Sequence, residues 1–588
     1  MDRFAALAGV LVLLAPCSAA PCRAAAEADG GDGAHLPLDI LAQELDYNHT
    51  NLVSSEGLRP YYLGYTVTET HTVSLAATLG AVTLNIEDRR RWLDVVVRVG
   101  DYALDNTHQI RGRGSGFGGR SGGGGVLSLE DDGDAIRHTL WLQTDSAFKA
   151  AVKRFARVQT NIKVKVEEED KSDDFSREEP SVYVEAPAKL EIDREAWARR
   201  LRRLSAIARE HPLVYSSQLA LAATAETSFM VTSEGTRLQT SATRWRLRLT
   251  AGTKAEDGMG LSQSYTFDRV IGPDGVASAG LPDDKAVAAR FEQVIEQVLA
   301  LRQAPLVEPY AGPAILRNRA SGVFFHEIFG HRIEGHRQKD VEEGQTFTKR
   351  IGQPVLPDFM SVHDDPTRAK FAGIDLRGYY KYDDEGVPAR DVTLVENGIL
   401  RTFLLSRSPV AGFARSNGHG RRQPGRAVVA RQGNLIVTST RQVPFGKLRE
   451  LLIEECRKQG KPYGLLFEDI TGGFTGTRRR GPQSFKVLPV VVYRVYADLL
   501  QAQPDELVRG VDIVGTPLTC FEKIICTGDD PDVFNGTCGA ESGWVPVSAV
   551  SPSILVSSIE IEKRERSQSR PPILEAPVAE GRQPAAGP

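Results

Sequence analysis

The chain has 588 residues, of which 41% are hydrophobic and 25% are charged, as in globular proteins with material for two or three hydrophobic cores. Its 72 basic and 76 acidic side chains give a formal net charge of -4, so no global positive field attracts nucleic acid or anionic membranes. The composition therefore excludes a largely disordered chain and a generally basic nucleic-acid-binding protein, and local sites must carry the function.

The N-terminus has the layout of a secretory signal peptide. An apolar run at residues 4–16 is followed by mostly small residues as far as residue 26. The run is shorter than the about 20 apolar residues of a transmembrane helix, and no later apolar stretch is long enough to cross a membrane. We expect a signal peptide at residues 1–26, which takes Cys17 and Cys22 with it, and export to the periplasm or the extracellular space.

Residues 36–304 are predicted to form an α+β region, which can comprise two subdomains. Helical patterns occur at residues 36–46, 146–157, 193–210 and 283–302, the third beginning at Asp193 as its N-cap. Strand patterns occur at residues 61–75, 83–85 and 92–99, and as short alternating strands across 213–270.

Two segments of this region are predicted to be loops. Residues 111–125 contain nine glycines but lack the glycine-lysine-serine/threonine ending of a phosphate-binding loop, which favours a mobile surface loop. Residues 167–174 form an acidic run that we interpret as an exposed loop. A proline-containing break at residues 305–313 marks the predicted domain boundary.

Residues 306–563 are predicted to form a mainly β domain that carries one helix rich in histidine, so the fold class of the chain is α+β. The helix is expected at residues 320–337, and the clearest strand patterns are at 314–316, 392–395, 399–405, 487–495 and 554–561. Residues 564–588 are rich in charge, proline and alanine and are predicted to be a disordered tail.

Three of the eleven histidines lie within residues 326–336, which begin with HEIFGH. In the common metalloprotease motif two histidines four residues apart lie about 40° apart around a helix. His326 and His331 are five apart, which in a regular helix places them about 140° apart. A π-bulge or kink, most naturally at Gly330, would bring them together. The spacing alone leaves both a metal ligand and an ordinary polar helix residue open.

The histidine segment and four later blocks resemble the TldD/PmbA family. The H-E-x-x-x-H motif and the pattern that follows it are matched from His326 through Glu334. The later blocks, in the expected order, are DDEG at 383–386, VENG at 395–398, NGHGRR at 417–422 and NGTCG at 535–539. Together these matches cover most of residues 314–563, so the resemblance is specific.

The resemblance implies a catalytic metal site. In this family two motif histidines and a cysteine near the C-terminus hold the metal, which here implies His326, His331 and Cys538 as ligands of one zinc ion per chain. Three protein ligands leave the fourth tetrahedral position for water, as in catalytic rather than structural zinc sites. Glu327 would be the general base that takes a proton from the metal-activated water as it attacks a peptide carbonyl.

Four further residues with metal-donor atoms are expected to have other roles. Glu334 and His336 are competing ligands by position, and we expect them to be supporting or structural groups. Cys520 and Cys526 are the nearest cysteine pair and are expected to be core or disulfide residues.

A glycine-rich turn carries His419, Arg421 and Arg422. These side chains can border the substrate cleft and hold a substrate carbonyl or terminus. A solvated turn is an equally good interpretation of the same pattern, so the sequence leaves both open.

The resemblance implies a zinc-dependent peptidase for unfolded or flexible peptides, working as a homodimer or as a heterodimer with a PmbA-like paralogue. A mainly β domain can hold such a peptide by strand addition. One alternative is a non-catalytic peptide-binding or assembly subunit, against which the intact motif argues. Another is a structural zinc with Glu334 or His336 as fourth ligand. Family members are commonly cytoplasmic, so the expected signal peptide departs from the family pattern.

Overall fold

The structure is a computed structural model that describes residues 36–110, 123–163, 170–272, 280–340, 343–344, 346–478, 485–498, 503–515, 517–564, 570–574 and 576–577. The expected signal peptide, most of the glycine-rich segment, part of the acidic run and most of the expected tail lie outside these residues. All helices and strands of the described residues belong to one unit, which begins at Leu36. None of these helices combines the length and the apolar character needed to span a membrane.

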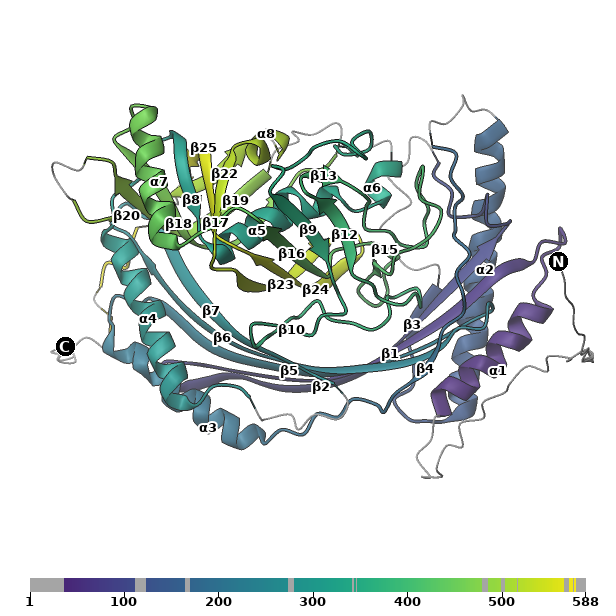
Figure 1. Ribbon diagram of the computed structural model, residues 1–588. Coiled ribbons are helices and arrows are strands. Elements are labelled where there is room, and N and C mark those ends of the chain that lie inside the picture. Colours follow the sequence, from purple (N-terminus) through teal and green to yellow (C-terminus); the bar gives the residue numbers. More distant parts are fainter. Residues whose placement is uncertain are drawn as a thin grey trace, which may run out of the picture. The chain divides into compact units, whose positions relative to one another are not determined.

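The first half of this unit is built on a seven-stranded sheet. Its neighbours run in the order β3-β2-β1-β5-β6-β4, with β7 paired to β6. The strands are β1 (Pro60–Thr78), β2 (Ala81–Val99), β3 (Gly123–Val126), β4 (Val182–Val184), β5 (Ser216–Thr232), β6 (Arg237–Lys254) and β7 (Gly260–Ile271). The long strands curve together, and their concave side faces the second half of the chain (Figure 1).

Four helices cover the other face of this sheet. They are α1 (Leu36–Asn51), α2 (Gly133–Lys163), α3 (Arg194–Ser205), which continues as the 3-10 helix η1 (Ala206–Glu210), and α4 (Asp284–Gln303). Alternate residues of β5 such as Leu219 and Leu221 pack against α3 and α4, and Leu63 and Tyr65 of β1 pack against α1 and α2. Because side chains alternate along a strand, the residues between them point to the concave face.

The second half contains two larger sheets. One has the strands β8 (Tyr310–Leu316), β17 (Gln442–Val443), β18 (Tyr463–Thr475), β19 (Phe485–Tyr496), β20 (Glu506–Val508), β21 (Val511–Gly515), β22 (Ile524–Gly528) and β25 (Ile554–Lys563). The pairings β8-β18-β19-β21-β25-β8 close a ring within it. The other has β9 (Met360–Asp364), β12 (Val392–Glu396), β13 (Ile399–Leu400), β16 (Asn434–Ser439), β23 (Asp532–Ala540) and β24 (Gly543–Ser551).

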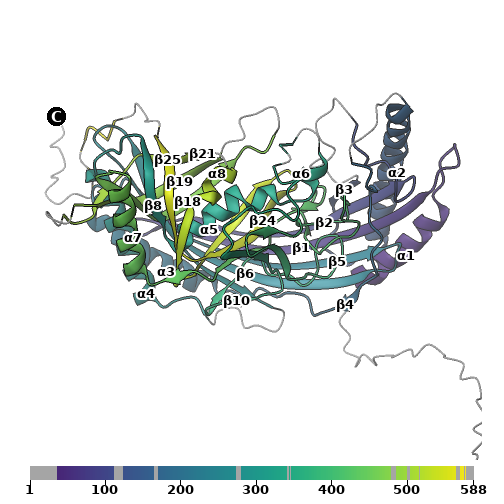
Figure 2. The same cartoon turned by 45° about the horizontal axis from the view of Figure 1, so that its top comes forward.

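The helix α5 (Asn318–Ile328) lies between these sheets, in contact with β18 and β19 of one and with β23 and β24 of the other (Figure 2). Every residue from Ala320 to Ile328 is buried, as expected of a helix covered on all sides. The remaining elements are α6 (His336–Lys339), α7 (Phe445–Lys458), α8 (Pro517–Glu522), β10 (Lys370–Phe371) with β11 (Ile374–Asp375), and β14 (Gly420–Arg421) with β15 (Val429–Ala430). The two sheets thus enclose α5 and fix its position.

The predicted α+β class, with a mainly β C-terminal part, is confirmed. The prediction of short strands across residues 213–270 is wrong, since β5 and β6 have 17 and 18 residues. Likewise, residues 83–85 and 92–99 belong to one 19-residue strand, β2. The mainly polar residues 85–91 interrupt its apolar pattern, but they pair with β1 throughout, and this pairing rather than apolar alternation maintains the strand.

Smaller differences concern single elements. The predicted strand at 399–405 is regular only at Ile399–Leu400, the end of the glycine-rich segment forms β3 instead of a loop, and α7 was not predicted. Hydrophobic clusters fall within 38–298 and within 307–561, but the domain limits 36–304 and 306–563 remain a prediction.

Candidate metal centre

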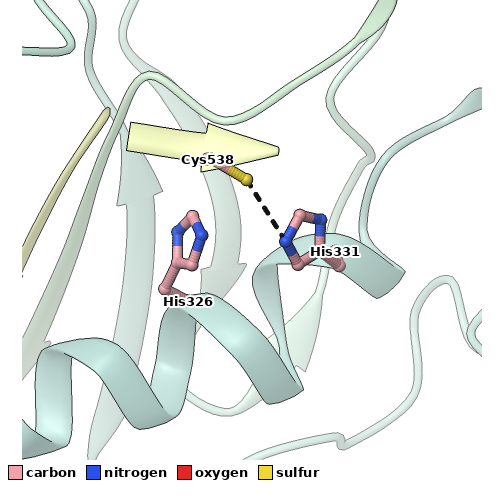
Figure 3. A group of neighbouring side chains, drawn as sticks. All are labelled: His326, His331 and Cys538. Carbon is pink, nitrogen blue, oxygen red and sulfur yellow. Dashed lines mark hydrogen bonds between the residues drawn. The ribbon is translucent and has the colours of Figure 1, made fainter. Parts of the chain in front are cut away.

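Three side chains with metal-donor atoms meet at one buried point (Figure 3). His326 lies on α5, His331 on the short 3-10 helix η2 (Gly330–Arg332), and Cys538 on β23. One donor atom from each lies within 4.8 Å of the other two, and Cys538 Sγ is 3.3 Å from His331 Nε2. The structure thus brings together the three residues that the family resemblance indicated.

The way in which α5 ends brings the two histidines together in spite of their five-residue spacing. The α-helix stops at Ile328, and after Phe329 the chain continues as the tighter helix η2. The predicted departure from regular helix geometry near Gly330 is therefore confirmed, although it is a change of helix type instead of a π-bulge. The predicted helix at 320–337 is wrong in its length for the same reason. Arg332 secures the end of α5, because its Nη1 donates to the Ile328 carbonyl at 3.1 Å.

Gly330 is needed for space and not for an unusual backbone angle. A Cβ atom at this position would lie 1.9 Å from Oε1 of the buried Gln432 side chain. Gln432 Nε2 in turn donates to the His326 carbonyl at 3.4 Å. The glycine therefore lets Gln432 pack beside both histidine-bearing helices.

Cys538 comes from the edge strand β23, where it pairs with Val545 of β24. Its carbonyl accepts a hydrogen bond from Arg431 Nη2 at 2.9 Å, which fixes the strand beside the histidines. Burial raises the pKa of the Cys538 thiol, but His331, His326 and Arg431 outweigh this effect and hold the pKa well below its usual value. The environment therefore favours the thiolate, which is the form that binds metal.

A carboxylate supports His331 from the side away from Cys538. Glu334 Oε1 lies 3.3 Å from His331 Nδ1, and Arg337 Nε donates to Glu334 Oε2 at 2.8 Å. Burial raises the pKa of Glu334, but His331 and then Arg337 lower it to about 2. His336 Nε2 is paired with Glu541, away from the donor group. Carboxylates that hold the second nitrogen of a metal-binding histidine are a common feature of metal sites.

The donor group fits a zinc ion. One thiolate and two imidazoles form a set that zinc accepts, and zinc sites with three protein ligands are of the catalytic kind. His326 Nδ1 is buried and has no hydrogen-bond partner among the described residues, so the ring is not committed to another protein group. Neither Glu334 nor His336 belongs to the described cluster of donors.

The donor group lies in the wall of a cavity of about 1110 Å³. Its wall includes Glu327, the edge of β18 from Asp469 to Thr475, and residues of β23, β6 and β7. Glu327 is only 8% exposed. A Cβ atom at Gly473 would lie 2.9 Å from Glu327 Cγ. Because Gly473 has no side chain, Glu327 has room to lie beside the donor residues.

The turn with His419, Arg421 and Arg422 is buried, so the interpretation as a solvated turn is wrong. His419 Nε2 lies 3.3 Å from Asp364 Oδ1, outside the metal cluster. Arg421 and Arg422 line a second, smaller cavity of about 180 Å³. All four described cysteines, Cys456, Cys520, Cys526 and Cys538, are unpaired, and Cys526 packs in a hydrophobic cluster.

The sequence reasoning missed two features of the cavity. Gly473 has no signal in a single sequence beyond its place in a glycine pair. The arginines of β6 lie at alternate positions, Arg244, Arg246 and Arg248, a pattern that is visible in the sequence and that predicts one charged strand face.

The fold and the site together define a protein with a candidate metal site in the wall of a large cavity. Residues 310–563 match the family model of the PmbA/TldA metallopeptidase C-terminal domain. Residues 310–563 thus form a C-terminal domain of the TldD/PmbA type, as the sequence motifs predicted.

Known proteins agree with this assignment. A metalloprotease of Archaeoglobus fulgidus is 30% identical over 243 residues, which cover 41% of this chain and 51% of that protein. A zinc metalloprotease TldD homolog of Saccharolobus solfataricus is 27% identical over 280 residues, which cover 45% and 57%. The matched region thus spans about half the length of these curated relatives.

Solved structures extend the similarity of fold to the N-terminal half. TldE from Thermococcus kodakarensis superposes with a TM-score of 0.59 at 13% identity, over 89% of this chain and 100% of that one. A Thermotoga maritima protein described as a putative modulator of a DNA gyrase gives a TM-score of 0.56 at 16% identity, over 89% and 99%. At these identities the likeness shows the fold alone.

Proposed function

We propose that the chain is a zinc-dependent peptidase that hydrolyses peptide bonds of unfolded or flexible peptides, with one zinc per chain. The observation that carries the proposal is the meeting of His326, His331 and Cys538 in a cavity wall that Glu327 also lines. The names of the relatives, metalloprotease and zinc metalloprotease TldD homolog, support the reaction and the metal.

When bound, zinc would lower the pKa of a coordinated water to about 7 and polarise the substrate carbonyl. The residues of the chain supply the rest. Glu327 follows the donor His326 directly, and its side chain faces the same cavity. Its carboxylate can therefore take the proton of the attacking water and pass it to the leaving amine. Glu334 Oε1 lies 3.3 Å from His331 Nδ1, where its charge favours this orientation of the ring.

Two strand edges in the cavity wall support a peptide substrate. Among the described pairings β23 pairs with β24 alone, and β18 beyond Phe467 pairs with β19 alone. Each strand therefore has an edge without a partner strand beside the donor group, although Arg246 and Arg431 donate to two carbonyls of β23. An extended peptide can add to such an edge through main-chain hydrogen bonds, which give affinity with little dependence on sequence. Folded proteins do not offer a free extended segment of this kind.

The decisive experiment is the substitution Glu327→Gln. We expect zinc content to remain one per chain while cleavage of a denatured protein mixture falls by at least about 100-fold, the usual contribution of a general base. The matched control is Glu343→Gln, because Glu343 also lines the cavity but pairs with Arg337 at 3.3 Å. Undiminished cleavage in Glu327→Gln, or cleavage that resists zinc chelation, would contradict the proposal.

A non-catalytic peptide-binding or assembly subunit is the alternative function, and it predicts no cleavage by the wild-type chain. A closed structural zinc would need Glu334 or His336 as fourth ligand. His336 is paired with Glu541, which argues against it, and His336→Ala is expected to leave the zinc content unchanged. We further propose export to the periplasm or the extracellular space, and a homodimer or a heterodimer with a PmbA-like paralogue. Cell fractionation and light scattering would test these two points.

A further inference from the structure

The concave face of the long sheet carries a row of arginines. Arg244, Arg246 and Arg248 occupy alternate positions of β6, while the intervening Trp245 and Leu247 are buried under α3 and α4. Arg246 and Arg248 line the large cavity and Arg244 lines the smaller one. We refer to these three residues as the arginine row.

The neighbours of the arginine row leave its charged groups accessible. On the adjacent strand β5, Arg248 and Arg246 are paired with Ala220 and Ala222, whose methyl groups are too short to cover a guanidinium. Arg248 is exposed to the cavity. Arg246 and Arg248 therefore present positive charge to the space where the peptide would lie.

The carboxylates nearby balance this charge only in part, since Arg244 Nη1 pairs with Glu226 at 3.2 Å but Arg246 and Arg248 are not fully compensated. Asp268 is shared, since Arg246 Nε donates to it at 2.7 Å and Arg377 Nη1 at 3.3 Å. Burial and then Arg246 lower the pKa of Arg377 to about 10, which reflects two positive groups around one carboxylate. Arg248 has no ion-pair partner among the described residues, and its Nη2 donates to Ser264 Oγ at 3.5 Å. An uncompensated guanidinium in a cavity is a binding site for a carboxylate.

A further arginine approaches from the opposite wall. Arg319 lies seven residues before His326 on α5, and two helical turns place both on the same face. Its Nε is buried without a hydrogen-bond partner among the described residues, although Asp469 is close enough to interact electrostatically. Burial raises the pKa of Asp469, so this acid is a weak counterion for Arg319.

The distance of these charges from the metal donors can be estimated along the chain. Arg246 Nη2 donates to the carbonyl of Asn535 at 3.0 Å, three residues before Cys538 on β23, which corresponds to about 10 Å. Seven helical residues between Arg319 and His326 also correspond to about 10 Å. An extended peptide advances about 3.3 Å per residue, so about three residues separate the two places.

We propose that Arg246, Arg248 and Arg319 bind a carboxylate of the substrate and thereby place the scissile bond about three residues from it. This inference rests on the proposed peptidase function and names its substrate class, peptides with a carboxylate at that distance. The carboxylate can be an aspartate or glutamate side chain, or the α-carboxylate at the C-terminus of the peptide.

The test uses synthetic twelve-residue peptides that contain no acidic side chain and have an amidated C-terminus. One arm moves a single aspartate along the peptide, and the other restores the free C-terminal carboxylate. Mass spectrometry of the products is expected to show cleavage that moves with the carboxylate and stays about three residues from it. The arm in which the cleaved position follows the carboxylate shows whether a side chain or the C-terminus supplies that carboxylate. Cleavage at positions independent of the carboxylate in both arms would overturn the inference.

The residues are tested with Arg248→Gln and Arg319→Gln in the zinc-loaded protein. Each is expected to lower kcat/KM for the carboxylate-bearing peptide about tenfold more than for the acid-free amide, as for loss of a charge-assisted hydrogen bond. Arg248→Lys should restore part of the preference. The control is Arg199→Gln, a substitution of an exposed arginine on α3 outside the cavity. An unchanged preference in both glutamine variants would overturn the assignment of these residues.

The outcome is separable from that of the proposed function. If the wild-type protein cleaves none of these peptides, the peptidase proposal fails. Carboxylate recognition is then measured by fluorescence anisotropy of the labelled peptides on the same proteins. Tighter binding of the acidic peptide, lost in Arg248→Gln, would support recognition without cleavage, and equal binding of both peptides would overturn recognition as well.

Discussion

At the scale of single residues, the position of Glu327 depends on the lack of a Cβ atom at its neighbour Gly473. Gly473 of β18 faces Glu327, and a Cβ there would lie 2.9 Å from Glu327 Cγ and 2.9 Å from the Lys486 carbonyl. The carbonyl belongs to the paired strand β19 and cannot yield easily. A methyl group would therefore displace the glutamate instead of the strand.

We predict that Gly473→Ala lowers kcat by at least about tenfold while the zinc content stays the same, because Glu327 moves and the three donors do not. Gly446→Ala is the matched control, since a Cβ at Gly446 in α7 meets nothing within 4 Å. The measurement is peptide cleavage beside metal analysis of the same sample. Loss of zinc in Gly473→Ala would show that the substitution disturbs the donors and would refute this explanation.

The sequence could indicate the donors only in part. His326 and His331 are close in sequence, but their spacing suits a regular helix badly, and the structure brings them together by ending α5 at Ile328. Cys538 is 207 residues beyond His331, so neither spacing nor periodicity can connect them, and the family motifs did. Gly473 and Arg319 act through contacts made in the folded chain, which no local pattern records.

At the scale of elements, the cap of α3 was predicted better than the lengths of helices and strands. Asp193 caps α3 as expected, because its side chain accepts from the Ala196 amide three residues on. By contrast, β2 continues through the mainly polar residues 85–91 because β1 supplies its hydrogen bonds along the whole length. Strand extent depends on the partner strand, whereas a helix cap depends on residues within one turn.

The end of β2 contains a buried ion pair with a consequence for acid stability. Asp105 Oδ2 accepts from Arg98 Nη1 and from the Tyr61 hydroxyl, each at 2.7 Å. Burial raises the pKa of Asp105, but Arg98 and then hydrogen bonds from Thr107 and Tyr61 outweigh it, so the pKa lies below its ordinary value. The ionised form therefore stabilises the fold fully above the unfolded-state pKa of about 3.9, and this contribution is lost as pH falls through the lower folded-state pKa.

We predict that Asp105→Asn lowers the free energy of unfolding at pH 7 by roughly 3–5 kcal/mol, because it leaves Arg98 without its charge partner. It should also make the loss of stability below about pH 4 shallower than in the wild type. Urea unfolding at several pH values measures both effects, with the exposed Asp358→Asn as control. Parallel pH profiles for Asp105→Asn and wild type would rule out this role of Asp105.

At the scale of the whole molecule, a buried ion pair joins the two halves of the unit. Arg407, which is 2% exposed, belongs to the C-terminal half and donates through Nη1 and Nη2 to Glu234 of the β5–β6 turn, each at 2.7 Å. Its guanidinium also lies 3.8 Å from the ring centroid of Phe175. The concave sheet forms one wall of the cavity, so this contact helps to hold the cavity together.

We predict that Arg407→Met destabilises the protein by roughly 3–5 kcal/mol, since Glu234 loses its partner. A double-mutant cycle with Glu234→Gln should give a coupling energy above about 1 kcal/mol, measured by urea unfolding. A coupling below about 0.5 kcal/mol would mean that the two side chains act independently and that other contacts join the halves.

The order of the donor residues along the chain also determines when, during synthesis, all three of them are present. Because Cys538 lies 207 residues after His331, a ribosome that adds roughly 5–20 residues per second needs about 10–40 s to translate from one to the other. Throughout that interval the nascent polypeptide has both imidazoles but lacks the thiolate. The donor group of His326, His331 and Cys538 therefore cannot be completed until most of the chain has been translated.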